Sequence, residues 1–346
     1  QRSMLDLLRE AYLIPKRFHG KAGKNPALLT DADGMLLKNI KSDISHHEFS
    51  KFQETDFSPW KKRSKYVRIR EYVLKLEEEI VISFASDYVA GAHPEIIKRL
   101  AETNMENLSG YGTDPYCAQA AEKIRQYCHC PEAEVYFLVG GTQTNATVID
   151  ALLKSYQGVV AADTGHIATP ESGAIEFGGH KVLTVPQKDG KISAAQIEKL
   201  VKDFYDDANY EHMVMPGMVY ISQPTEYGTL YSREELAVLS KVCRENHLPL
   251  YVDGARLAYA LASPENDVTL TDLAELSDVF YIGGTKCGAL FGEAVVIPQK
   301  GRIPHFLQRS EPQSGAVSPS AGAFSFSEAQ WVCRETDRRS RRKTVP

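Results

Sequence analysis

The stretch DVFYIGGTKCGALFGEAVVI, residues 278–297, decides how the rest of the chain is interpreted. An apolar run from Val279 to Ile282 stops at two glycines, and a second run, rich in β-branched residues, ends at Ile297. This pattern predicts two buried strands joined by a turn. The turn carries Lys286, and an amine held between apolar walls at a strand end can form a Schiff base with a carbonyl cofactor. A solvated surface lysine beside a turn is the alternative interpretation of this stretch alone.

Upstream of this stretch, predicted strands alternate with predicted helices. The predicted strands are short apolar runs, and they cover residues 81–85, 135–139, 158–163, 181–185, 218–222 and 248–253. The predicted helices cover residues 93–104, 115–128, 144–156 and 255–262, and two more begin after Ser193 and Ser232, each with a capping-box partner three residues later. The alternation predicts an α/β fold with a mostly parallel sheet and helices on both faces. Ligands of such sheets bind at the carboxyl ends of the strands.

The composition is that of a soluble globular protein. Of the 346 residues, 43% are hydrophobic and 25% are charged, which is ordinary for such proteins. A net charge of −5 gives no indication of nucleic acid or of a membrane surface as a partner. No apolar run approaches the roughly 18 residues that span a bilayer, and no signal peptide precedes the body of the chain. A cytoplasmic location is therefore expected.

The six cysteines do not suggest a disulfide framework in a chain of this size. Cys128, His129 and Cys130 are consecutive, whereas paired zinc ligands are usually separated by about two to four residues. A loop at a helix end is the favoured interpretation of these three residues, and no metal site is expected.

Both ends of the chain lack the alternating pattern. Residues 1–80 are expected to form an N-terminal extension of unknown role, in which the basic run at 61–65 is a solvated surface. Residues 304–346 are rich in Ser, Gly, Ala and Pro and end in a basic cluster, so poor order is expected there. A nuclear-targeting or nucleic-acid role for that cluster is the alternative. The central domain is expected to cover residues 81–303.

Four predicted strand ends carry residues suited to chemistry. The turn LVGGTQTN combines glycines and the Thr142 hydroxyl with a helix start, which predicts a phosphate cup. Asp253 closes an apolar strand, where a carboxylate needs a partner, and an internal ion pair with Arg256 is the structural alternative. His166 lies on the loop after strand 158–163. Lys286 follows Asp253 by 286 − 253 = 33 residues, room for one helix and one strand.

Together these residues are what a pyridoxal 5'-phosphate enzyme requires. A lysine holds the aldehyde as an imine, a carboxylate keeps the ring nitrogen protonated, and a helix end binds the phosphate. Their order along an alternating α/β chain favours this cofactor over any separate interpretation of each residue.

The same residues resemble the low-specificity threonine aldolases, a family in the β-eliminating lyase superfamily of fold-type-I pyridoxal phosphate enzymes. The resemblance covers residues 83 to about 300, in the stretches FASDYVAGAHPEI, GYGTDP, GGTQTN, HIATPESGAIEFGGHKV, YVDGARL and GGTKCGALFGEAVV. It implies a mostly parallel seven-stranded sheet with helices on both faces, like the large domain of aspartate aminotransferase.

The resemblance also implies a role for individual residues. Lys286 would be the Schiff-base lysine, Asp253 the partner of the pyridine nitrogen, and His166 the residue stacked on the ring and the candidate base. The residues implied at the phosphate are Gly141, Thr142 and Gln143, those implied near the substrate carboxylate are Ser86 and Arg256, and those in a motif bordering the site are Tyr111 and Asp114.

The implied reaction is the retro-aldol cleavage of threonine or allo-threonine to glycine and an aldehyde, by a homodimer or homotetramer. Family members continue into a small C-terminal domain, which is expected to be missing here, so impaired activity is expected. The alternatives are β-elimination or transamination, a catalytically inert large-domain fragment, and a DNA-binding module built on the basic ends. The expected partner is a small-molecule amino acid, with no nucleic acid and no membrane.

Overall fold

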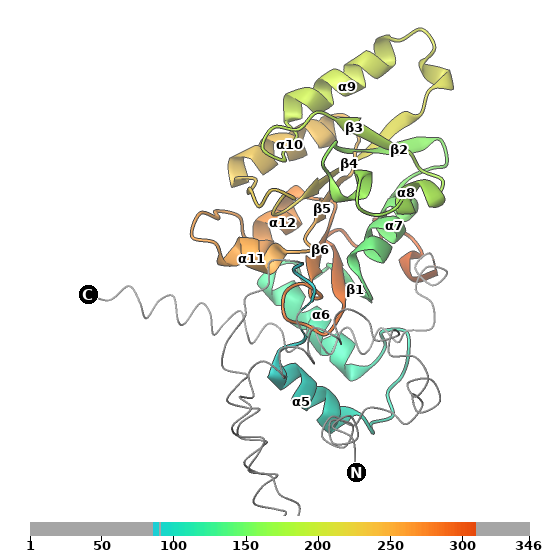
Figure 1. The fold of residues 1–346 in the computed structure, drawn as a ribbon. Coiled ribbons are helices and arrows are strands. Elements are labelled where there is room, and N and C mark those ends of the chain that lie inside the picture. The colour runs from blue at the N-terminus through green and yellow to red at the C-terminus, as the bar shows by residue number, and fades with distance from the viewer. Residues whose placement is uncertain (1–85, 90, 309–346) are drawn as a thin grey trace, which may run out of the picture. The chain divides into compact units, whose positions relative to one another are not determined.

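The computed structural model describes residues 86–89 and 91–308, whose arrangement is shown in Figure 1. The sequence-based expectations for residues 1–80, for the strand at 81–85, and for the chain from residue 309 onward lie outside the described residues. Within the described ranges, no helix is both long and apolar enough to cross a lipid bilayer.

A seven-stranded sheet forms the centre of the described region. Its strands are β1 (Glu134–Leu138), β2 (Gln157–Ala162), β3 (Val182–Val185), β4 (Met215–Ser222), β5 (Leu250–Asp253), β6 (Val279–Gly283) and β7 (Glu293–Ile297). They lie in the order β1-β7-β6-β5-β4-β2-β3. β7 pairs antiparallel with both β1 and β6, and the pairs from β6 across to β3 are parallel. The predicted mostly parallel sheet is confirmed.

The helices of the described region are α5 (Pro94–Thr103), α6 (Pro115–Tyr127), α7 (Gly141–Leu152), α8 (Ala174–Phe177), α9 (Ala194–Asp206), α10 (Arg233–Glu245), α11 (Leu257–Ala262) and α12 (Leu270–Leu276). Two short 3-10 turns, η3 (His166–Ala168) and η4 (Tyr210–His212), complete the elements. Both predicted capping boxes are present, at the start of α9 and of α10.

Helices cover both faces of the sheet (Figure 1). Alternate strand residues pack into two separate cores, because successive side chains of a strand point to opposite faces. Val160 and Val219 join the core that contains residues of α6, α9, α10 and α12. Val159 and Met218, their immediate neighbours, join the core that contains residues of α7 and α8. The strands are therefore buried on both faces, as continuous apolar runs predict.

The stretch at 278–297 forms the two buried strands that its pattern predicts. β6 and β7 pair antiparallel, with Phe280 opposite Val296, and every residue of both strands is buried. Between β5 and β6, however, lie two helices, α11 and α12, so the expectation of a single helix there was wrong. The seven-residue α12 is capped by Thr269 and Asp272, which form a capping box.

Two predicted helices need correction. α7 begins at Gly141 and ends at Leu152, whereas residues 144–156 were predicted, because the helix starts directly after an extended Gly140. α5 begins at Pro94 and ends at Thr103, whereas residues 93–104 were predicted, and within it Ile96 is buried but Ile97 is exposed. Successive helical residues are rotated by about 100°, so Ile96 and Ile97 point in different directions, and of the two only Ile96 is buried.

Candidate active site at the carboxyl edge of the sheet

The ends of β5 and β6 approach each other closely at this edge. Gly283 N donates to Gly254 O at 2.9 Å, and a β-carbon at Gly254 would lie 1.9 Å from Tyr281 O. Glycine is therefore needed at residue 254 for the two backbones to pack. This contact places the strand end that carries Asp253 beside the turn that carries Lys286.

Asp253 is 4% exposed, and hydrogen bonds from three neighbouring groups offset the cost of burying its carboxylate. Its Oδ2 accepts hydrogen bonds from Tyr220 Oη at 2.6 Å and Asn145 Nδ2 at 3.0 Å, and its Oδ1 accepts one from Ala255 N at 2.9 Å. Burial, together with the charge of Asp253, raises the pKa of Tyr220 well above its ordinary value, so that hydroxyl stays a donor. The alternative of an internal ion pair between Asp253 and Arg256 is wrong, because Arg256 pairs with Asp87 instead.

His166 lies in η3, directly after β2, as predicted. Its Nδ1 lies 2.7 Å from Oε1 of Glu171, whose side chain is fully buried. This hydrogen bond raises the pKa of His166, although burial of the ring opposes the rise, and the charge of Asp253 adds to it. The backbone N of His166 also donates to Glu226 Oε1 at 2.9 Å. The imidazole is thus held by one nitrogen and keeps Nε2 for another partner.

Lys286 is half buried in the turn between β6 and β7, so it is not the solvated surface lysine of the alternative interpretation. Its backbone carbonyl accepts a hydrogen bond from Tyr259 Oη at 2.9 Å. The charge of the Lys286 amine acts on Asp87, His166 and Glu293. The apolar walls expected around this amine are therefore replaced in part by charged and titratable groups.

Arg256 precedes α11 and reaches a carboxylate far away in the sequence. Its Nε and Nη2 donate to Asp87, so the two groups form a two-pronged ion pair. Burial alone would raise the pKa of Asp87, but the hydrogen bond and charge of Arg256, with the charge of Lys286, lower it. Ser86, also predicted near the substrate carboxylate, is half buried and adjacent to Asp87.

The predicted phosphate cup is the first turn of α7. Gly140 is its extended N-cap and provides no side-chain cap, so the amides of the first turn have no acceptor within the helix. Thr142 is exposed, and Gln143 Oε1 accepts a hydrogen bond from Val139 N at 3.0 Å. The N-terminal end of a helix favours an anion at this position.

Two buried polar atoms at this turn test whether it fits a phosphate. Gln143 Nε2 and Tyr281 Oη are buried without a hydrogen-bond partner among the described residues. A β-carbon at Gly141 would lie 3.2 Å from Tyr281 Oη, so the glycine keeps this space open. Unpaired donors beside free helix amides fit the phosphate of pyridoxal phosphate, and Lys286 and Asp253 are the groups that its aldehyde and ring nitrogen need.

Glu293 lies at the start of β7, directly behind the Lys286 turn. It is 3% exposed, and its Oε2 accepts a hydrogen bond from Gly284 N at 3.1 Å. Burial raises the pKa of Glu293 to about 8, although hydrogen bonds from Thr285 and Gly284 oppose the rise. A buried carboxyl group therefore supports the turn that presents the lysine.

Asp114 and Tyr111, the two residues of the motif bordering the site, lie just before α6. Asp114 is the N-cap of α6 and accepts hydrogen bonds from the amides of Tyr116 and Cys117, both at 2.9 Å. Tyr111 has a φ of 61° and a largely exposed side chain.

Cys128 is the C-cap of α6, so the Cys-His-Cys run begins at a helix end. In the described part of the chain, no group of three or more His, Cys, Asp or Glu side chains could hold a metal ion.

Sequence reasoning missed the residues that connect the predicted ones. They are Asp87, Asn145, Glu171, Tyr220, Glu226 and Glu293. A usable signal existed for some of them: Tyr220 and Glu293 are polar groups inside strand runs, and Asn145 and Glu171 lie within the motifs already singled out.

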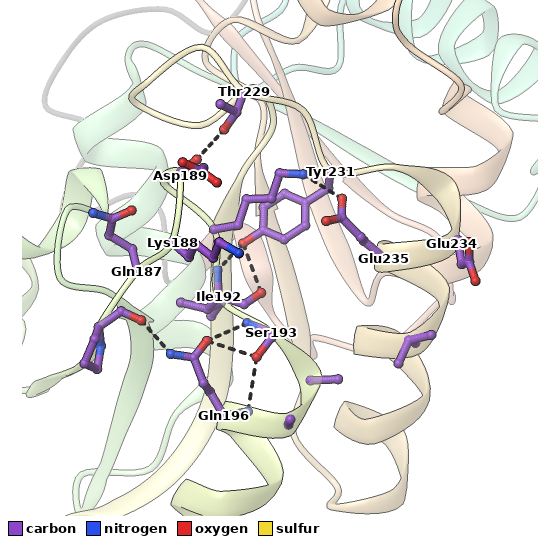
Figure 2. Close-up of a pocket in the computed structure, with 15 residues that line it drawn as sticks. Gln187, Lys188, Asp189, Ile192, Ser193, Gln196, Thr229, Tyr231, Glu234 and Glu235 are labelled. Carbon is purple, nitrogen blue, oxygen red and sulfur yellow. Dashed lines mark hydrogen bonds and ion pairs between the residues drawn. The ribbon is translucent and has the colours of Figure 1, made fainter.

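A separate cavity of about 1000 Å³ lies between the 187–192 hairpin and the first turns of α9 and α10 (Figure 2). Some of its polar groups pair with one another. Tyr231 Oη accepts from Ile192 N at 2.8 Å, and Lys191 Nζ forms an ion pair with Glu235 at 2.7 Å. None of the predicted site residues lines this cavity, which is therefore separate from the candidate site at the carboxyl edge of the sheet.

Two family models match different parts of the chain. The model of the beta-eliminating lyase family matches residues 83–323. A model described as a domain of unknown function (DUF4866) matches residues 1–75. The two matches meet close to residue 80.

Individual proteins show the same relationship. The low specificity L-threonine aldolase of Pseudomonas aeruginosa is 35% identical over 260 residues, which cover 72% of this chain and 70% of that protein. The solved threonine aldolase of Leishmania major is 42% identical with a TM-score of 0.68, over 71% of this chain and 72% of its own. A Thermus thermophilus aspartate aminotransferase mutant shares the fold at 16% identity, with a TM-score of 0.56 over 75% of this chain and 72% of its own.

Proposed function

This chain belongs to the beta-eliminating lyase family, and from that membership we propose that it is a pyridoxal-phosphate-dependent carbon–carbon lyase. Its proposed substrates are β-hydroxy-α-amino acids such as threonine or allo-threonine, which it cleaves between Cα and Cβ to glycine and an aldehyde. One observation supports the proposal most strongly. His166, Asp253 and Lys286 lie at the same edge of the sheet, close enough for the charges of Asp253 and Lys286 to act on His166.

Different residues at this edge of the sheet bind different parts of the cofactor in this proposal. When bound, pyridoxal phosphate supplies an aldehyde carbon that joins covalently to an amine and a ring that accepts the electron pair of the broken bond. Lys286 provides the amine from a turn supported by Glu293. Asp253, already oriented by Tyr220 and Asn145, holds a proton on the ring nitrogen. The first turn of α7 holds the phosphate with Gly141, Thr142 and Gln143.

Arg256 and Ser86 bind the substrate carboxylate in this proposal. A guanidinium can bind a carboxylate through two parallel hydrogen bonds, which determine the orientation of the carboxylate and also add affinity. Orientation matters here because the position of the substrate carboxylate would decide which bond at Cα is aligned for cleavage. Arg256 therefore contributes to the choice of reaction in addition to binding.

His166 takes the proton from the β-hydroxyl group of the substrate. Glu171 occupies Nδ1, and a carboxylate only accepts hydrogen bonds when ionised, so Nδ1 carries the hydrogen and Nε2 has the lone pair. His166 loses that lone pair when it is protonated, so its raised pKa predicts that cleavage requires a pH above this pKa.

The proposal is tested with the full chain in two steps. An absorbance spectrum with pyridoxal phosphate should show a visible band that the Lys286→Ala variant loses and that Lys188→Ala, in the separate cavity, retains. Glycine and an aldehyde should then form from L-threonine. Absence of the band refutes the cofactor proposal, and a band without any turnover indicates a cofactor-binding large-domain fragment. Pyruvate or another keto acid in place of glycine indicates β-elimination or transamination.

We further propose a cytoplasmic homodimer or homotetramer with three parts, residues 1–80, 81–303 and 304–346. The separate family matches to residues 1–75 and 83–323 support the first boundary. Large exposed apolar side chains, among them Met105, Tyr111 and Phe177, support burial against another copy. Sedimentation at several concentrations tests the assembly, and a monomer at every concentration contradicts it.

A further inference from the structure

Asn145 lies in α7 and is 1% exposed. Its Nδ2 donates to Glu171 Oε1 at 2.7 Å and to Asp253 Oδ2 at 3.0 Å. Its Oδ1 accepts a hydrogen bond from Tyr251 Oη at 2.8 Å. A single amide group thus lies between two buried carboxylates and is bonded to both.

The orientation of this amide is determined by its neighbours. A primary amide has two N–H donors on nitrogen and acceptor capacity on oxygen. Rotating Asn145 by 180° about χ2 would direct its oxygen at two carboxylates and its nitrogen at the Tyr251 hydroxyl. Burial raises the pKa of Tyr251 well above its ordinary value, so this hydroxyl keeps its hydrogen and donates. Only the observed orientation satisfies every partner.

The amide completes a continuous path from the imidazole to the carboxylate at the end of β5. His166 Nδ1 bonds Glu171 Oε1, and the same Oε1 accepts from Asn145 Nδ2, which also bonds Asp253. Glu171 Oε2 is buried and has no hydrogen-bond partner among the described residues. The position of the Glu171 carboxylate therefore depends on the single oxygen that Asn145 and His166 share.

We propose that Asn145 is a positioning residue, which holds Glu171 against His166 Nδ1 and Asp253 in place, so that His166 presents Nε2 to the substrate. This inference rests on the proposed function, because the importance of Nε2 comes from the proton it accepts there. The geometric part, that Asn145 holds Glu171 on His166, does not require cofactor or substrate.

The charged groups around His166 come from four segments. Glu171 follows it in the same segment, Glu226 lies in the loop after β4, Asp253 ends β5, and Lys286 lies in the turn after β6. The hydrogen bond to Glu171 raises the pKa of His166 most, burial opposes it, Asp253 adds to the rise, and the Lys286 charge counteracts it. A change confined to Glu171 should therefore be visible in the titration of this imidazole.

The test measures the His166 titration by NMR in the full chain without cofactor, with the resonance assigned from the His166→Gln variant. Asn145→Leu removes both donors and approximately preserves side-chain size. We expect its His166 pKa to fall toward the ordinary value near 6.5, because Glu171 is no longer held on Nδ1. Glu171→Gln should give a fall in the same direction. Asn266→Leu, which removes an amide bonded to Val268 O in a distant loop, is the matched control and should leave the titration unchanged.

Each outcome decides the inference. A wild-type pKa in Asn145→Leu shows that Glu171 stays in place without the amide, and a higher pKa shows that it stays and becomes more basic; either result overturns the proposal. Asn145→Ala, which cannot overpack, is measured if the leucine variant does not fold. With cofactor and L-threonine, the pH at which kcat is half-maximal should fall together with the His166 pKa. If no glycine forms even in the wild type, the proposed function fails while the NMR result still stands.

Discussion

The guanidinium of Arg256 is bound to the carboxylate of Asp87 through Nε and Nη2, across 169 residues of sequence. A guanidinium carries five N–H groups, so this contact occupies one side and leaves Nη1 and the second hydrogen of Nη2 for another carboxylate. Asp87 therefore orients Arg256 toward a second anion.

The Asp87→Asn variant should weaken substrate binding, because it loses the charge that orients Arg256. We expect KM for L-threonine to rise roughly 3- to 10-fold with a smaller change in kcat, since both partners are about one-third exposed and solvent screens the pair. Steady-state kinetics provide the measurement. Asp203→Asn, in a surface pair of α9, is the matched control. A lower KM in Asp87→Asn would show that Asp87 competes with the substrate.

The pairing of His166 with Glu171 should stabilise the fold at low pH. A histidine whose pKa is raised on folding contributes stability below its unfolded pKa, near 6.5, and that contribution is lost as the pH rises through the folded pKa. The loss of unfolding free energy in His166→Gln should therefore be larger at pH 5.5 than at pH 8.5. Urea denaturation without cofactor measures this. An equal loss at both pH values would contradict the prediction.

Glu293 should have the opposite effect on stability. Its folded pKa of about 8 lies above that of an unfolded glutamate, so the folded state keeps a proton that the unfolded state has released, and stability falls as the pH rises from about 4.5 to 8. Glu293→Gln removes this loss. Relative to wild type, its unfolding free energy should increase by about 4 kcal/mol between pH 5 and pH 9, because the two pKa values differ by about three units over this range.

Urea denaturation across this pH range tests the effect, with Glu245→Gln on the surface of α10 as the control for removal of one carboxylate. A difference between Glu293→Gln and wild type that does not change with pH would show that Glu293 ionises normally in the fold.

Gly254→Ala should be strongly destabilising, because its β-carbon would overlap the Tyr281 carbonyl oxygen. Backbone atoms of two paired strands cannot move apart cheaply, so we expect a loss of about 3 kcal/mol or more, together with loss of the visible band. Thermal denaturation measures the loss. Gly110→Ala, where a β-carbon meets nothing within 4 Å, is the control. A Gly254→Ala variant as stable as that control would refute the close packing of β5 and β6.

Local patterns were sufficient to find the strands and the loops that carry chemistry. Burial on both faces makes each strand a continuous apolar run, so strands such as β2 and β6 are visible in the sequence. Lys286, Asp253 and His166 interrupt or follow such runs, which is why they could be singled out. Helix ends were less well predicted, as α7 shows, because the start of that helix depends on a glycine with no side-chain cap.

The sequence by itself determined the alternation of strands and helices and the residue types at each strand end, since both depend on neighbours a few positions away. Only the tertiary structure decided that Asn145 bonds Glu171, 26 residues away, and Asp253, 108 residues away. It also decided that Arg256 pairs with Asp87 and not with Asp253. The physical reason is that such hydrogen bonds depend on the order and register of strands in the sheet, which bring distant segments within 3 Å, and local periodicity carries no information about that order.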